Sequence, residues 1–122
     1  MTTILLFNFP ETEQKTWRLL LRKMPGVRLL PVKQEQFGVT IGRLLEGQTE
    51  PGPVQGGAFD QRMVVFADAA GPFLEQLIDM SHQVTAEKTY RAVLTETNRK
   101  WNAIKLFSNL QAEEAYLQKH KR

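Results

Sequence analysis

The sequence predicts an α+β fold, in which two β-α-β-α repeats form a four-stranded ferredoxin-like sheet with helices packed on it. Two apolar runs, Thr3–Phe9 and Arg62–Asp68, lack the alternation of a half-exposed strand, which is typical of central strands covered on both faces. Each run is followed by a helical pattern, a second strand and a further helix. When the chain is shifted by 62 positions, Val27–Leu45 lies over Thr89–Phe107 without a gap. The same succession of elements is therefore expected twice.

Local patterns predict each element of the first repeat. After the first strand, one helical face at i, i+3, i+4 and i+7 spacing is formed by Trp17, Leu20, Leu21 and Met24. Val27–Val32 then predicts a strand, and Pro31 confines it to an edge of the sheet because proline has no N–H for a ladder. A short helix is expected at Thr40–Glu46, with Thr40 as its N-cap.

The second repeat follows the same order. In its first strand, Met63–Phe66 is matched with Ile4–Phe7 of the first repeat. In its first helix, Leu77 and Ile78 are matched with Leu20 and Leu21. Thr89–Thr95 alternates between apolar and polar residues, which predicts a half-exposed edge strand. The final helix is expected from about Asn98 to Lys119.

The chain is predicted to be a single domain, 1–122, with internal repeats at 3–46 and 62–119. They are joined by the loop 47–61, which holds four glycines and two prolines and has no apolar period. Because this loop lies between two similar units, a connector is favoured over a functional lid.

Two sheet topologies fit strands one and three in the centre. The favoured one is the ferredoxin-like order 4-1-3-2, in which the two halves run antiparallel and both crossover helices lie on one face. The alternative is an α/β parallel doubly wound sheet of order 2-1-3-4. It would bring five residues to one crevice at the carboxyl ends of the strands, namely Asn8, Asp68, Thr95, Thr97 and Asn98. In the antiparallel sheet, Asn8 and Asp68 would lie on opposite rims.

Composition narrows the chemistry. The chain has no cysteine, which excludes disulfides, thiolate zinc sites and cysteine nucleophiles. Neither His82 nor His120 has a carboxylate or nucleophile at a recognisable spacing, and no phosphate-binding glycine loop is present. No catalytic residue, metal ligand or cofactor is therefore predicted. The short apolar run at the start has no basic residue before it, so the expected location is cytoplasmic, without a membrane span.

The formal charge of +3 equals that of three cations at the end of the chain: without Lys119, Lys121 and Arg122 it falls to 0. A solvated tail is the simplest explanation. Sheet-mediated nucleic-acid binding would require exposed aromatic side chains, whereas Phe7 and Phe66 belong to runs that are expected to be buried. The sequence therefore argues against nucleic acid as a partner.

One turn, Thr95–Asn98, has two interpretations. Its side-chain oxygens could cap the final helix, or the same hydroxyls and amides could hold an anion or polar ligand at a helix N-terminus. Capping is favoured, because every helix needs its terminal amides satisfied. The candidate ligand-binding residues are Asp68, Thr95, Thr97, Asn98 and Trp101.

The sequence TETNRKW at Thr95–Trp101 carries a resemblance. With the apolar strand and Leu-rich helix around it, the pattern T-x-T-N-x-x-W resembles the bacterial domain of unknown function 3783 family. The resemblance covers the second repeat; in the first, the equivalent places are held by Lys33, Glu35, Gln36 and Val39. It implies no activity, substrate or cofactor.

The expected function is that of a non-enzymatic cytoplasmic binding or regulatory module that forms a homodimer. An edge strand such as Thr89–Thr95, or a poorly covered sheet face, would invite a symmetric partner. The alternative is a protein or enzyme that binds a small molecule or nucleotide phosphate in a crevice near Asp68 and Asn98.

Overall fold

The computed structural model describes residues 1–48, 50–51 and 59–120. Within these residues the chain divides into two compact units. The sheet unit comprises Met1–Lys33 and Asp60–Leu94, and the helical unit comprises Gln34–Phe59 and Thr95–Arg122. Residues 49 and 52–58 of the predicted connector loop lie outside the described residues.

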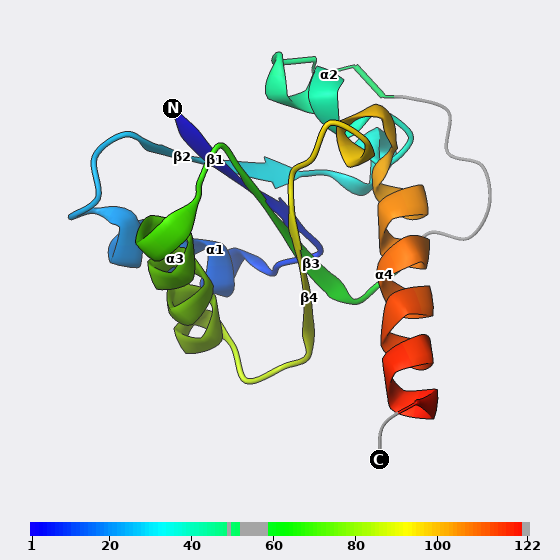
Figure 1. The fold of residues 1–122 in the computed structure, drawn as a ribbon. Helices are drawn as coiled ribbons and strands as arrows, with labels where there is room; N and C mark the ends of the chain where they lie inside the picture. The colour runs from blue at the N-terminus through cyan, green and yellow to red at the C-terminus, as the bar shows by residue number, and fades with distance from the viewer. Residues whose placement is uncertain (49, 52–58, 121–122) are drawn as a thin grey trace. The chain divides into compact units, whose positions relative to one another are not determined.

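The elements follow one another as strand, helix, strand, 3₁₀ helix and helix, and this order occurs twice (Figure 1). They are β1 (Thr2–Phe7), α1 (Glu11–Leu21), β2 (Val27–Val32), η1 (Gln34–Gln36), α2 (Ile41–Leu45), β3 (Arg62–Ala67), α3 (Gly71–Val84), β4 (Thr89–Val93), η2 (Asn98–Lys100) and α4 (Ala103–Lys119). All the predicted strands and helices are present, with shifts at their ends.

The sheet is mixed. Its order is β2-β1-β3-β4; β1 and β3 each pair in parallel with the strand that follows their own helix, and pair with each other antiparallel. The ferredoxin-like hypothesis was wrong in its strand order, 4-1-3-2, but it did predict that the two halves run antiparallel. The parallel hypothesis had the observed order, 2-1-3-4, but was wrong in making every strand parallel. The predicted central and edge strands are confirmed. Apolar patterning reports how a strand is buried, but not which neighbour it takes or in which direction that neighbour runs.

Both crossover helices, α1 and α3, lie on the same face of the sheet (Figure 1). They cover Ile4 and Leu6 of β1 and Val64 and Phe66 of β3, and these residues form one core with Trp17 of α1 and Leu77, Met80 and Val84 of α3. The alternate residues of the central strands are also buried, among them Leu5, Phe7, Met63 and Val65. The lack of alternation in both central strands is thereby explained.

The strand registers correct the match between the two halves. Thr2 pairs with Val27 and Arg62 pairs with Thr89, so the first strands are offset by 60 positions and the second strands by 62. Pairing Ile4 with Met63 was wrong by one residue, which exchanges the two faces of a strand. The two crossover helices begin with the same offset of 60 positions, so Leu77 of α3 is equivalent to Trp17 of α1 and not to Leu20. α3 is longer, with 14 residues against 11 in α1. Because the two helices differ in length, a single shift without a gap cannot align both the strands before them and the strands after them.

Two arginines on the strands bond to the helices that cover the sheet. Arg62 of β3 donates two hydrogen bonds to the carboxylate of Glu13 on α1, at 2.6 and 2.9 Å, and this charge-assisted bonding raises the pKa of Arg62 above its ordinary value. Arg91 of β4 donates to Ser81 Oγ of α3 at 2.7 Å and to the carbonyl of Thr89 at 3.1 Å. Burial lowers the pKa of Arg91. Neither arginine was singled out by its sequence pattern.

The helical unit is held together by its backbone near two helix starts. Thr40, before α2, and Asn102, before α4, form an isolated antiparallel bridge. The N–H of Ile41 donates to the carbonyl of Trp101 at 2.8 Å, and the N–H of Ala103 donates to that of Phe37 at 3.2 Å. The predicted cap is confirmed, since Thr40 Oγ1 accepts from the N–H of Arg43.

Candidate functional site

In the turn Thr95–Asn98, the first and last residues bond to each other. Thr95 Oγ1 accepts from the N–H of Asn98 at 3.0 Å, and Asn98 Oδ1 accepts from the N–H of Thr95 at 2.8 Å. The Thr95 carbonyl accepts from the N–H of Arg99 at 3.1 Å. This is the reciprocal arrangement of a capping box, with asparagine in the place usually held by Glu or Gln. Asn98 is buried, and the carbonyl oxygen of its side chain points into the turn.

A second cap, missed from the sequence, begins the last helix. The final helix does not start at Asn98, because the 3₁₀ helix η2 ends at Lys100 and Trp101 is extended. Asn102 is the N-cap of α4, and its Oδ1 accepts from the N–H of Lys105 at 2.9 Å. A signal was present: Asn102 lies 62 positions after Thr40, which was predicted to be a cap.

Trp101 and Thr97 differ in their surroundings. Trp101 is partly exposed, and the ammonium group of Lys105 lies 5.0 Å from the centre of its ring, within range of a cation–π interaction. Its backbone joins η2 to α2 through the bond from Ile41. Thr97 is exposed, and its side chain makes no capping hydrogen bond. Thr95, Asn98 and Trp101 thus all make hydrogen bonds that hold the turn and its neighbouring helices in place.

Asp68 belongs to the sheet unit, whereas the other four predicted site residues belong to the helical unit. It follows β3 with a φ of 61°, is exposed, and its carbonyl accepts from Thr2 Oγ1 at 2.8 Å. Asn8 has a φ of 66° after β1 and donates to the carbonyl of Gln61 at 3.1 Å. Both residues end a strand in the left-handed region, which Asn and Asp tolerate. They lie on opposite rims because β1 and β3 are antiparallel, so the crevice of the parallel sheet is not formed.

Among the described residues, no group of three His, Cys, Asp or Glu side chains is placed to hold a metal ion. In the same part of the chain, no helix is both long and apolar enough to cross a membrane.

Residues 62–117 match the family model for a domain of unknown function, DUF3783. The match extends from the start of β3 to near the end of α4, and supports the resemblance inferred from the second half of the chain. No curated protein and no solved structure matches the chain. The family description names no activity, so the geometry of the described residues carries the functional argument.

Replacing Asn98 with alanine tests whether the turn is structural. We expect Asn98→Ala to lower the free energy of unfolding by about 1–2 kcal/mol, because it leaves the N–H of Thr95 without its acceptor. Thr97→Ala is the matched control and should change stability by less than about 0.5 kcal/mol. Urea denaturation of the two variants measures the difference. An Asn98→Ala chain as stable as Thr97→Ala would contradict a capping role.

Proposed function

We propose that the chain is a non-enzymatic binding module that self-associates through α4. The observation that carries the proposal is the exposure of the second half of this helix. Its buried residues, Ala103, Leu106 and Phe107, all lie within its first five positions. Farther along, Tyr116 is 61% exposed and Leu117 is 67% exposed. Large exposed apolar side chains on a long helix are typical of a surface that meets a partner.

The exposed face of α4 is shaped for a helix partner. Two shallow grooves run along it: one is lined by Asn102, Ile104, Lys105, Ser108, Asn109 and Ala112, and the other by Asn109, Ala112, Glu113, Tyr116 and Leu117. They share Asn109 and Ala112, so they continue one another. Lys105, Asn109, Ala112 and Tyr116 recur at the spacing of one helical face. The small side chain of Ala112 permits another helix to approach closely.

The charges on this face fit a second copy of the chain. Lys105 and Glu113 are each four residues from Asn109, on either side of it. In an antiparallel pair of α4 helices centred on Asn109, each Lys105 lies opposite the Glu113 of the other copy, which gives the two equivalent contacts of an isologous dimer. A helix of 17 residues is about 25 Å long, so this contact alone falls below the area of tight complexes and predicts a weak dimer.

A charge swap tests the dimer. The molar mass of the wild-type chain, measured by light scattering from micromolar to millimolar concentration, should rise from monomer to dimer. Glu113→Lys should keep the chain monomeric by placing like charges opposite each other, and Lys105→Glu combined with Glu113→Lys should restore the dimer. Glu75→Lys is the control: it makes the same charge change at an exposed position on α3, and this variant should dimerise normally. A wild-type monomer throughout, or a swap that fails to restore association, would overturn the proposal.

The assignment as a non-enzyme rests on how the turn uses its polar groups. Thr95 and Asn98 bond to each other, and Asp68 holds its strand end through its backbone. The crevice hypothesis at Asp68 and Asn98 gains no supporting contact from this arrangement. A thermal-shift screen of nucleotides, sugar phosphates and metal ions addresses it directly: we expect no compound to raise the melting temperature, whereas a ligand at one hundred times its dissociation constant would add about 2.7 kcal/mol.

We also infer that the two halves of the chain descend from one duplicated unit and fold as a single domain. The repeated element order, the equivalent registers of β1–β2 and β3–β4, and the N-caps Thr40 and Asn102 all support the duplication. The chain passes between the sheet and helical units three times, so neither unit is a continuous segment.

A further inference from the structure

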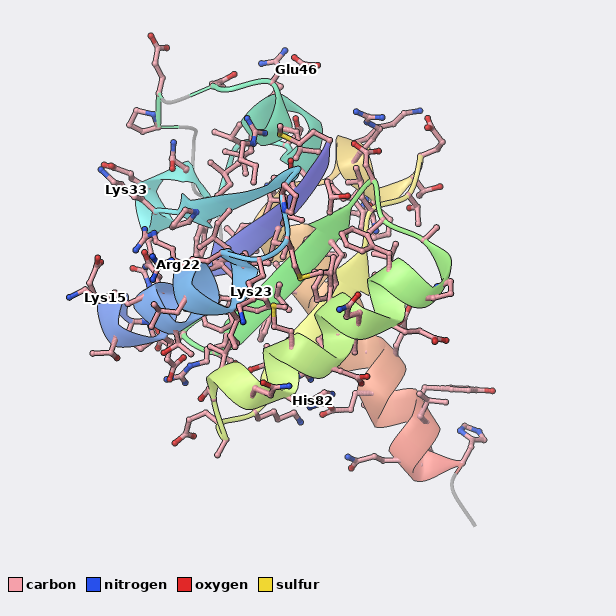
Figure 2. All side chains as sticks on the ribbon, turned by 90° about the vertical axis from the view of Figure 1, so that its left-hand side faces the viewer. Lys15, Arg22, Lys23, Lys33, Glu46 and His82 are labelled. Carbon is pink, nitrogen blue, oxygen red and sulfur yellow. The ribbon has the colours of Figure 1, made fainter. Side chains whose placement is uncertain are left out.

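A ridge of cations runs along the second half of α1 and the turn that follows it. Lys15, Arg18 and Arg22 recur at i, i+3 and i+7, and Lys23 follows them directly; all four are exposed. Figure 2 labels Lys15 on α1, and Arg22 and Lys23 in the turn just after it. Trp17, on the opposite side of α1, is fully buried in the core. We call Lys15, Arg18, Arg22 and Lys23 the basic ridge.

The ridge is part of a larger imbalance of charge. Between Glu13 and Glu35 the chain has six Lys or Arg residues and no acidic residue. Met1–Lys33 thus carries six cations against two acids, a formal charge of +4, which exceeds the +3 of the whole chain. The basic character is therefore not confined to the tail at 119–122. Within the described residues, no acidic side chain pairs with a member of the basic ridge.

We propose that the basic ridge binds the sugar–phosphate backbone of double-stranded nucleic acid without reading its sequence. Phosphate contacts of Lys and Arg supply the salt-dependent, sequence-independent part of such binding. Lys15 and Arg22 are about 10 Å apart along the helix axis, and a duplex carries one negative charge per about 1.7 Å of its axis. Lys15 and Arg18 of α1, with Arg22 at its C-cap, therefore face several phosphates at once.

Other anionic partners fit the ridge less well. The apolar side of α1 is used in the core, so the helix has no face to insert into a membrane. Among the described residues 11–24, Leu19 is the large apolar side chain that is mostly exposed, at 61%, and a single such residue is little for the centre of a protein interface. The aromatic residues of Met1–Lys33, namely Phe7, Phe9 and Trp17, are all buried, so no platform for stacking single-stranded bases is present.

Polarisation of a short labelled DNA duplex of mixed sequence tests the proposal. If three ridge cations contact phosphates, affinity should fall about 40-fold between about 50 and 200 mM salt. The variant with Lys15→Gln, Arg18→Gln and Arg22→Gln should bind at least about tenfold more weakly at the lower salt, and the slope of log K against log salt should fall from about 2.7 in magnitude to near zero. These residues are exposed, and an unchanged melting curve will show that the variant is folded.

The tail supplies a matched control of equal charge. Lys119→Gln, Lys121→Gln and Arg122→Gln together also remove three positive charges, and should leave affinity within about twofold of wild type. Equal losses in both triple variants would indicate attraction by net charge alone and overturn a localised site. No binding by the wild-type chain at low salt, or binding to vesicles of anionic phospholipid that exceeds binding to DNA, would overturn it as well. The proposal does not depend on self-association, since Glu113→Lys should retain the ridge.

Discussion

Trp17→Ala is expected to lower the free energy of unfolding by about 3–5 kcal/mol, the range for truncating a large buried aromatic residue. Trp17 is fully buried on the inner face of α1. It packs in the core with Ile4, Leu6 and Leu77, and its ring lies edge-on to that of Phe9, with the centroids 6.3 Å apart. The cavity would lie between α1 and the sheet, where the surrounding side chains belong to three separate elements. Urea denaturation followed by far-ultraviolet circular dichroism measures the loss.

Trp17→Phe should cost much less, under about 2 kcal/mol, although it also removes ring atoms. The indole Nε1 is buried and has no hydrogen-bond partner among the described residues. An unsatisfied buried donor costs about 1–3 kcal/mol, and phenylalanine removes that cost while keeping an aromatic ring in the core. Trp101 remains as a fluorescent reporter in the variant. Equal destabilisation by phenylalanine and alanine would show that the indole N–H is satisfied in solution.

The sequence predicted the elements well because each is encoded locally. The helical spacing of Trp17, the missing N–H of Pro31 and the hydroxyl of Thr40 each act on their own element. Strand order and direction depend on which strands meet in space, and the β1–β3 pair joins residues about 60 positions apart. The one-residue error in matching the halves has the same origin, since a similar apolar run fits either face of a buried strand.

For the candidate site, the sequence identified residues that contact each other but not how they are arranged. Thr95 and Asn98 do come together, but they bond to each other at the start of η2 and do not cap the final helix as predicted. The cap of α4 was assigned too early because the 3₁₀ turn η2 separates Asn98 from Asn102, and a short 3₁₀ turn leaves no periodic signal. The basic ridge could have been found from the helical spacing of Lys15, Arg18 and Arg22. It was missed because the net charge of a chain does not report where its charges lie.

Phe59→Ala is expected to cost about 3–5 kcal/mol and to loosen the start of α4. Phe59 is buried between two other rings of the helical unit: its centroid is 4.9 Å from that of Phe37 and 4.1 Å from that of Phe107, with interplanar angles of 22° and 5°. Removing the middle ring leaves a gap between the segment before α2 and the buried first half of α4. Amide hydrogen exchange should therefore accelerate around Phe107 more than in β1.

Phe59→Leu separates the two contributions of that ring. Leucine keeps much of the buried apolar volume but loses ring stacking, which is worth about 0.5–1.5 kcal/mol per aromatic pair, so the variant should lie between wild type and alanine. The prediction also bears on self-association, because the proposed dimer surface lies on the same helix as Phe107. We expect Phe59→Ala to weaken dimerisation and Phe59→Leu to preserve it. If Phe59→Ala leaves the exchange around Phe107 unchanged, the aromatic stack does not hold α4, and its exposed half must be ordered by other contacts.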